Sequence, residues 1–398
     1  MEATTLSQQT VRTGPVHAHS ERYLSLVCLI ALSCCGVDAA TPDSKPPSTA
    51  ERDGQHDFDF ELGSWSIHLQ KRLHPLAGSD EWVRFDGTSV TRKVWDGRAQ
   101  IEEFETDGAA GRIEGLTLRL YNPRTRQWSL YWANSKDGIL APPQVGQFAD
   151  GVGEFYGWDS LNGKPILIRF IWSKTAANSP HFEQAFSADG GKTWEVNWIT
   201  DQTRVGNSTR STLATPAAPP PPSGEASATA VARDGGHDFD PLIGSWNYRL
   251  KRRLHPLTGS ASWVEFAGTG TCFGLWDGRA NLDQAEFEGP SGHIEGLTLR
   301  LYDPQSHQWR LYWANSKQGT VVAPQIGEFR DGQGEFYAQD TLDDRSILVR
   351  FEWSRMSTSK PHFEQAFSAD GGKTWEVNWV TDQTRRTADS PAPSRPDR

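Results

Sequence analysis

The stretch HFEQAFSADGGKTWEVNW occupies His181–Trp198 and returns letter for letter at His362–Trp379. The second copy therefore follows the first at an offset of 181 positions, and the same offset aligns residues 53–204 with residues 234–385 without a gap. Each aligned segment is long enough to fold as a domain with its own core. The sequence thus predicts two tandem domains of one fold.

Within the repeated stretch, the SADGGKTW segment predicts a tight turn between two strands. Gly190 and Gly191 can adopt positive backbone φ angles, and the carboxylate of Asp189 can accept hydrogen bonds from turn amides. The segment matches the Asp-box pattern, which is best known from sialidase propellers and lies there away from the active site. The resemblance therefore implies a structural turn rather than glycoside hydrolysis.

The rest of each repeat consists of short runs with alternating apolar residues, separated by turn residues. One such run places Ile166, Ile168, Phe170 and Trp172 on one face, and its opposite face carries Ile171, which Glu352 replaces in the second repeat. A position that is apolar in one copy and charged in the other is expected to point outward. Nine or ten such runs per repeat, with few helical patterns, indicate an all-β fold built as a sandwich or an up-and-down barrel.

Several local motifs narrow this choice by resemblance. Gly63-Ser64-Trp65 opens the first strand, a WDGRA turn spans residues 95–99, Tyr131-Trp132-Ala133-Asn134-Ser135 ends a strand, and the S-x-DGGKTW segment closes the repeat. Together these motifs resemble the DUF1579-type family of lipocalin-like (calycin) bacterial proteins over both repeats. The resemblance implies two tandem lipocalin-like antiparallel β-barrels and a possible internal pocket, and it implies no reaction.

The composition predicts the limits of the parts. We expect an export signal region at residues 1–40, a disordered lead at 41–52, a first barrel at 53–204, a Pro/Ala/Ser-rich linker at 205–233, a second barrel at 234–385 and a disordered tail at 386–398.

The apolar run from Tyr23 to Leu32 follows Arg22 and is too short to anchor a chain across a bilayer, which is the layout of an export signal. We expect a periplasmic or secreted protein without a transmembrane span in its mature form. One alternative is a lipid anchor at Cys34 or Cys35, which follow imperfect lipobox sequences; another is a misassigned start and a cytoplasmic chain.

The formal net charge of −10, spread along both repeats, argues against a nucleic-acid partner. Cys272 is the single cysteine after the signal region, so no disulfide within the mature chain is expected, and its repeat partner Thr91 favours a buried small side chain over a nucleophile. The His and Cys spacing predicts no metal site, and we expect no cofactor.

Candidate site residues are polar side chains on otherwise apolar faces, together with the large rings beside them. Buried polar groups of this kind either close a hydrogen-bond network or meet a ligand. The candidates in the first repeat are Lys71, Glu105, Trp132, Asn134, Gln184 and Trp198, and those in the second are Arg252, Glu286, Trp313, Asn315, Gln365 and Trp379.

The function expected from these residues is non-enzymatic binding of a small, partly apolar ligand inside a barrel. No catalytic residue is assigned. One alternative is an isomerase or decarboxylase of the calycin type, for which Glu105 and Glu286 are the only plausible acids or bases. Another is a cell-envelope scaffold in which the barrels are filled and the outer surface makes the contacts.

Overall fold

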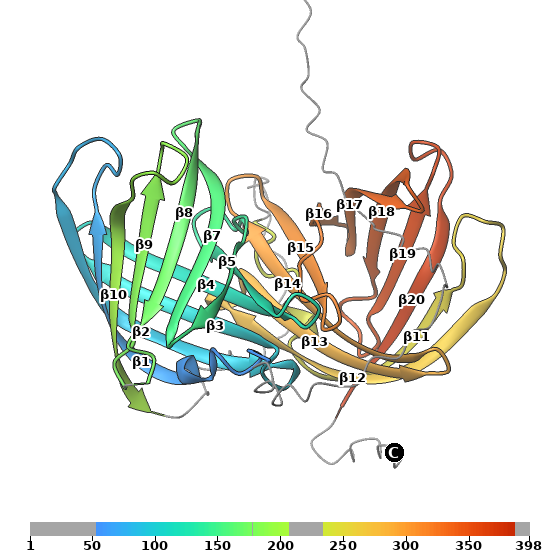
Figure 1. Ribbon diagram of the computed structural model, residues 1–398. Helices are drawn as coiled ribbons and strands as arrows, with labels where there is room; N and C mark the ends of the chain where they lie inside the picture. The colour runs from blue at the N-terminus through green and yellow to red at the C-terminus, as the bar shows by residue number, and fades with distance from the viewer. Residues whose placement is uncertain (1–52, 177, 207–233, 387–398) are drawn as a thin grey trace, which may run out of the picture. The chain divides into compact units, whose positions relative to one another are not determined.

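The computed structural model describes residues 53–176, 178–206 and 234–386, and in this part of the chain it contains two closed antiparallel barrels of ten strands each (Figure 1). The prediction of an all-β tandem of barrels is confirmed. The predicted signal, Cys34 and Cys35, and most of the lead, linker and tail lie outside the described residues, so the predicted limits of these parts stay predictions.

The strands of the two barrels follow one another in chain order. The first barrel consists of β1 (Gly63–Arg72), β2 (Trp82–Val94), β3 (Ala99–Gly108), β4 (Gly111–Asn122), β5 (Gln127–Asn134), β6 (Gln144–Ala149), β7 (Val152–Leu161), β8 (Lys164–Ser173), β9 (His181–Ser187) and β10 (Glu195–Gly206). The second consists of β11 (Gly244–Arg253), β12 (Trp263–Leu275), β13 (Ala280–Gly289), β14 (Gly292–Asp303), β15 (Gln308–Asn315), β16 (Gln325–Arg330), β17 (Gln333–Leu342), β18 (Arg345–Ser354), β19 (His362–Ser368) and β20 (Glu376–Arg385).

Each barrel closes because its first strand pairs on both sides. β1 pairs with β2 and β10, and β11 pairs with β12 and β20. Every other strand pairs with its neighbours in sequence, so the chain runs up and down around the barrel. The odd-numbered strands of the first barrel therefore all end at one rim, where the even-numbered strands begin.

The opposite end of each barrel is closed by the short helix that precedes the first strand, η1 (Asp59–Glu61) and η3 (Asp240–Leu242). Phe58, which is fully buried, packs there with ring centres 5.2 Å from Trp128 and 5.5 Å from Phe155. The buried Trp65 indole N–H donates to the Glu61 carbonyl at 2.7 Å. This explains the Gly-Ser-Trp motif: its Trp fixes the turn that plugs the barrel.

An arginine of the last strand completes this closed end. Arg204 stacks on Trp65 at 4.0 Å and donates to the Leu62 carbonyl at 2.6 Å. In the second barrel Arg385 lies 4.3 Å from the Trp246 ring and donates to the Ile243 carbonyl at 2.8 Å. The first and last strands are thus tied to the plug in both copies.

The repeated SADGGKTW segment forms the turn between β9 and β10. Asp189 Oδ1 accepts the backbone N–H groups of Lys192 at 3.1 Å and Thr193 at 3.0 Å, and the hydroxyl of Ser187 at 2.8 Å. Hydrogen bonds from Thr193 and Ser187 lower the pKa of this exposed carboxyl to about 2. Trp194 lies against Arg169, 4.8 Å from the ring centre to the guanidinium carbon, on the outer face of the sheet.

An apolar stripe faces outward on β4 of the first barrel. Leu116, Leu118 and Leu120 alternate along β4 with the inward Thr117 and Arg119 and are fully buried. They belong to one cluster of buried side chains with the equivalent leucines of β14, which are Leu297, Leu299 and Leu301.

Candidate functional site

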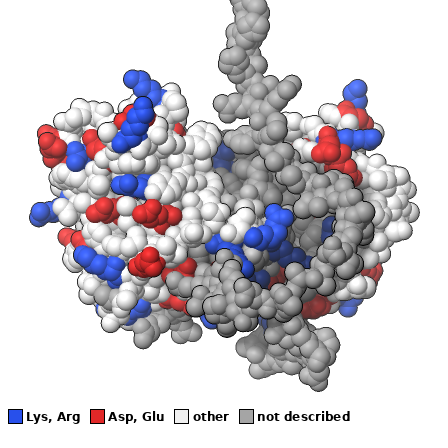
Figure 2. All heavy atoms as spheres, viewed as in Figure 1, with Lys and Arg blue, Asp and Glu red and all other residues white. Residues whose placement is uncertain are grey.

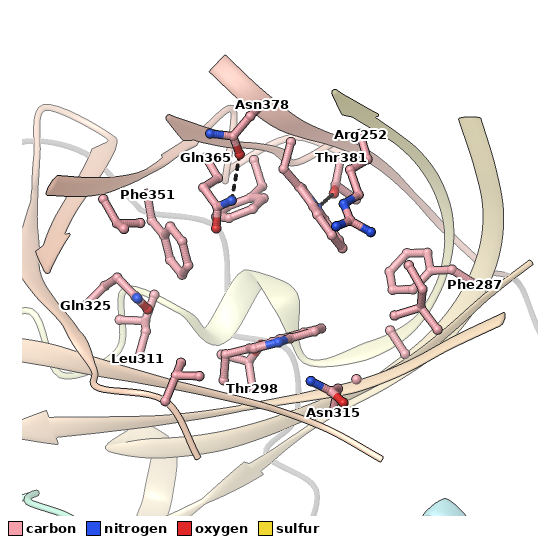
Figure 3. A pocket seen from close by; sticks show the side chains of 18 of the residues that line it. Arg252, Phe287, Thr298, Leu311, Asn315, Gln325, Phe351, Gln365, Asn378 and Thr381 are labelled. Atoms are coloured by element: carbon pink, nitrogen blue, oxygen red, sulfur yellow. Dashed lines mark hydrogen bonds between the residues drawn. The ribbon is translucent and has the colours of Figure 1, made fainter. Parts of the chain in front are cut away.

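Each barrel contains a pocket between its plug and its open rim. The first encloses about 430 Å³ and the second about 560 Å³. Both volumes fall within the roughly 300–1,000 Å³ that small-molecule sites usually have. Figure 3 shows the second pocket, with Arg252 and Phe287 toward one side of it and Leu311 and Phe351 toward the other. The interior is therefore not filled by side chains in either copy.

Aromatic rings near the open rim form much of the wall. In the first barrel Trp132 lies 6.0 Å from Trp198, and Phe104 lies 5.9 Å and 6.2 Å from these two rings. In the second barrel the equivalent Trp313 and Trp379 are 6.3 Å apart. The four tryptophans predicted as site residues thus line the pockets, and they offer flat apolar faces to a guest molecule.

A pair of side-chain amides spans two neighbouring strands of the wall. Gln184 of β9 donates through Nε2 to Asn197 Oδ1 of β10 at 2.7 Å, and Gln365 donates to Asn378 at the same distance (Figure 3). Each pair uses one hydrogen-bond donor and one acceptor, and every amide has further capacity. The pairs therefore place polar groups in a largely apolar wall.

Asn197 and Asn378 were not predicted as site residues. The pairing of β9 with β10 shifts between Val196 and Trp198, and this bulge brings Asn197 and Trp198 to the pocket although they are consecutive. Strict alternation places consecutive residues on opposite faces. A strand in which Trp198 points inward is therefore expected to point Asn197 outward. The sequence signal that could have found it is the repeated EVNW, in which an Asn stands beside a Trp in both copies.

The cations predicted at the site lie at the rim. Lys71 of β1 lines the first pocket with its Nζ 5.6 Å from the Trp198 ring centre, and Arg252 of β11 lines the second. Burial lowers the pKa of Lys71, and the positive charge of Lys136 lowers it further. The arrangement puts a positive charge where the apolar wall meets solvent.

Glu105 and Glu286 do not line the pockets, so the structure gives no support to their prediction as site residues. Glu105 pairs with Arg112 and Glu286 is exposed, so both face outward. The inward residues of β3 are instead Gln100, Glu102, Phe104 and Thr106, and the equivalent residues of β13 are Asn281, Asp283, Ala285 and Phe287. Three of these four residues are polar in β3 and two of the four in β13, so the apolar pattern assigned the wrong face of the strand to the interior.

Asn134 was also placed incorrectly, because it does not line the first pocket. Its Oδ1 accepts the Lys136 backbone N–H at 3.0 Å and its Nδ2 donates to Asp137 at 2.9 Å, so it shapes the turn after β5. Asn315 makes the equivalent bond to Lys317 at 3.1 Å and in addition lines the second pocket. The remaining predicted residues, Lys71, Gln184, Arg252 and Gln365 with the four tryptophans, do line the pockets.

A buried arginine lies beneath the first pocket. Arg119 is fully buried, donates to Glu102 at 2.5 Å, and has its guanidinium 5.1 Å from the Phe58 ring and 5.6 Å from Trp172. Glu61 Oε2 lies 3.8 Å from the same guanidinium. Burial raises the pKa of Glu61 to about 8, although the charge of Arg119 opposes this. At neutral pH this carboxyl is therefore mostly protonated.

The second barrel keeps the arginine and changes its partners. Arg300 donates to Asn281 at 2.8 Å and to Asp283 at 3.2 Å, and Tyr248 donates to Asp283 at 3.1 Å. Leu242 stands where the first repeat has Glu61. Cys272 is buried beside this network, as predicted, and burial raises the pKa of its thiol to about 12, which keeps it protonated.

The described residues contain no group of three or more His, Cys, Asp or Glu side chains placed to hold a metal ion. In the same residues no helix has the length and apolar character needed to cross a bilayer. Basic and acidic side chains lie interspersed over much of the face shown in Figure 2.

No family model matches the chain, and no curated protein matches it. Membership of the DUF1579-type family therefore stays a prediction. Among solved structures, the chain is similar to Rv2717c of M. tuberculosis, with a TM-score of 0.27 and 10% identity over 37% of this chain and 94% of that one. It is similar to a DUF3598 family protein of unknown function from Nostoc punctiforme, with a TM-score of 0.23 and 10% identity over 84% of this chain and 100% of that one.

A third similar structure is a mutant of Transferrin Binding Protein B from Haemophilus parasuis, with a TM-score of 0.18 and 7% identity over 81% of this chain and 76% of that one. Likenesses at such TM-scores carry no argument about this chain. The strand pairing of the chain defines two closed ten-stranded barrels in tandem. Each barrel has an internal pocket.

Proposed function

We propose that each barrel binds one small, partly apolar molecule between its plug and its open rim, without transforming it. One observation carries the proposal: both copies keep a cavity, of about 430 Å³ and about 560 Å³, with the same pair of tryptophans and the same amide pair in its wall. A ligand would exchange water for the aromatic faces, which is favourable in proportion to the apolar area covered.

The amide pair supports recognition of a polar group on that ligand. Gln184 and Asn197 bond to each other in the free protein, so an incoming group can bond to their remaining donors and acceptors without leaving a buried amide unsatisfied. The wall therefore favours molecules that combine an apolar body with one or a few polar atoms.

The test is to fill one cavity at a time in the full chain. Thr117 and Thr298 line the two pockets, so Thr117→Trp and Thr298→Trp place a large ring inside the first and second barrel respectively. With decan-1-ol as the probe, calorimetry should give two sites for the unchanged protein and one site for each variant. The matched control is Thr125→Trp in the exposed turn before β5, which should keep both sites. Two sites in every variant would place the probe elsewhere and refute the proposal.

The alternative of an isomerase or decarboxylase rested on Glu105 and Glu286 as acids or bases in the pocket. Both side chains face away from the cavities. Among the carboxylates that do line the cavities, Glu102 and Asp283 are engaged by Arg119 and Arg300. No specific observation favours a reaction over binding.

We further propose that the protein is exported, with the first barrel starting near residue 53 and the second near residue 234. The support is the apolar run from Tyr23 to Leu32 and the small residues that follow it. The mass of the processed chain tests this directly. Removal of residues 1–39 indicates a freely exported protein, a lipid adduct at Cys34 or Cys35 indicates an anchored one, and an intact N-terminus of the mature chain overturns export.

A further inference from the structure

The open rim of each barrel carries a cation that no acidic side chain balances. Among the described residues, Lys71 and Arg252 form no ion pair, and the charge that helps to lower the pKa of Lys71 is that of another cation, Lys136. The equivalent Lys317 lines the second pocket together with Arg252. The same two rim positions are basic in both copies of an acidic chain, so chance is a poor explanation of these cations.

The other charges of the rim are already engaged. Arg72 donates to Asp80 at 3.1 Å and lies 3.9 Å from Glu195, and Arg253 lies 3.9 Å from Glu376. Asp159 lines the first pocket from β7, where its Oδ1 accepts the backbone N–H of Ser160 at 2.7 Å. Among the described residues, Asp159 forms no ion pair with Lys71.

The second rim has the same arrangement and two further titratable side chains. Asp340 accepts the backbone N–H of Thr341 at 2.7 Å. His293 and Glu295 also line this pocket, and Glu295 is held by Arg98 at 2.6 Å and by the Ser316 hydroxyl at 2.7 Å. Arg252 and Lys317 are therefore the cations of this rim that can donate a hydrogen bond to an acceptor from outside the protein.

Lys71 and Arg252 are exposed at the rim, so the anionic group of a ligand can reach either cation and form a charge-assisted hydrogen bond with it. The apolar wall begins directly at this cation, since Lys71 lies over the face of Trp198. We propose that each barrel binds an amphipathic anion, whose apolar chain lies among the rings of the cavity and whose single anionic head group lies at Lys71 in the first barrel and at Arg252 in the second. This inference rests on the proposed function and names the ligand class of the same site.

The two barrels should differ in their response to pH. A guanidinium group is a permanent cation in proteins, whereas burial and Lys136 hold the pKa of Lys71 below its ordinary value. As the pH rises through that lowered pKa, Lys71 loses its charge and the first barrel loses its preference for an anion. The groups that face Lys71 are Lys136 and the ring of Trp198, with Arg72 next in the chain, and none of them is an acid that would restore the charge.

The experiment compares decanoate with decan-1-ol on the full chain by calorimetry, because the two probes share a chain length and differ in head-group charge. At neutral pH both should occupy two sites, with decanoate bound about tenfold more tightly or more, as expected for a hydrogen bond to a charged group. Lys71→Met should abolish the preference for decanoate at one site and leave decan-1-ol binding unchanged, and Arg252→Met should do the same at the other. Lys71→Arg should keep the preference at high pH, where the unchanged first barrel loses it.

The matched control is Lys93→Met, because Lys93 ends β2 near the closed end and pairs with Asp96 on the surface. Lys93→Met should keep both binding sites and the preference for decanoate over decan-1-ol at each of them. Retained binding of decan-1-ol shows that each variant is folded. Equal affinity for the two probes, or an undiminished preference for decanoate in Lys71→Met and Arg252→Met, overturns this inference and leaves the proposed function standing. Failure of both probes to bind overturns the proposed function itself.

Discussion

At the scale of single residues, the two copies differ most beneath the pockets, where Glu61 in one copy corresponds to Leu242 in the other. Arg119 and Arg300 each have one buried carboxylate partner, Glu102 and Asp283, and Glu61 is an additional acid beside the first of them. A second buried carboxylate beside one guanidinium favours the protonated form, because the charged form would be both desolvated and repelled.

This carboxyl makes the stability of the first barrel depend on pH. Its pKa of about 8 in the folded protein lies above the ordinary value of 4.5, so the folded state binds the proton more tightly. The contribution of Glu61 to the free energy of unfolding is therefore highest below about pH 4.5. It falls as the pH rises toward about 8, with a slope of up to about 1.4 kcal/mol per pH unit. Glu61→Leu should remove this slope and raise the free energy of unfolding at pH 8.

Urea unfolding at a series of pH values measures the effect, and Leu242→Glu is the converse variant. It introduces the extra acid into the second barrel, so it should lower stability and add a slope of the same sign. An unchanged pH dependence in Glu61→Leu would show that Glu61 does not carry the buried proton.

The sequence alone did not reveal the buried network of Arg119, Glu102 and Glu61. Arg119, Glu102 and Glu61 are charged, and charged residues are rarely fully buried, so a pattern of apolar residues assigns them to the surface. Lys71 and Gln184 line the first pocket, and the sequence pointed to them because each interrupts a clearly apolar face. Glu105 was assigned to the wrong face because three of the four inward residues of β3 are themselves polar, so no apolar alternation marks the inner side of that strand.

At the scale of elements, β3 and β13 give the two pockets their different shapes. The inward ring is Phe104 in β3, whereas β13 has Ala285 there and carries Phe287 two residues later, where β3 has Thr106. Phe287 packs 5.5 Å from Tyr248, which replaces Ile67. Moving the ring along the strand leaves space beside Trp313 and Trp379, in keeping with the larger second cavity.

The element-scale prediction is that the second barrel accepts bulkier guests. Ala285→Phe should fill the space beside the tryptophans and weaken binding of 1-adamantanol to the second barrel about tenfold or more, while decan-1-ol binding changes less. Phe104→Ala should open the first barrel to 1-adamantanol, so that the protein binds this probe at two sites, one in each barrel. Calorimetry with both alcohols measures this, and thermal unfolding checks that each variant folds. If neither variant changes the preference between the alcohols, the ring position does not set the pocket shape.

The strands and turns themselves could be predicted well, and the bulge in β10 could not. Tight turns such as that at Gly190 and Gly191 have sequence signatures, since positive φ angles favour glycine. The bulge at Val196–Trp198 has no turn signature of this kind, and its one signal is the Asn that stands beside a Trp in both copies.

At the scale of the whole molecule, the duplication made the fold predictable. Two copies show which positions tolerate a charge, and that comparison correctly oriented strands such as β8 without further sequences. The duplication also supplies an internal control for every variant, because a change in one barrel can be judged against the unchanged copy in the same chain. The shared wall of Trp132, Trp198 and Gln184, and its equivalents in the second barrel, is what unites the two sites.

The most direct test of the central claim is a crystal structure of the full chain grown with decan-1-ol. We expect density for one alkyl chain in each barrel, beside Trp132 and Trp198 in the first and beside Trp313 and Trp379 in the second, with the hydroxyl near the amide pair or the rim. Barrels closed by their own side chains, or pockets that hold only water at a saturating concentration of the probe, would contradict the claim that these barrels bind a small apolar ligand.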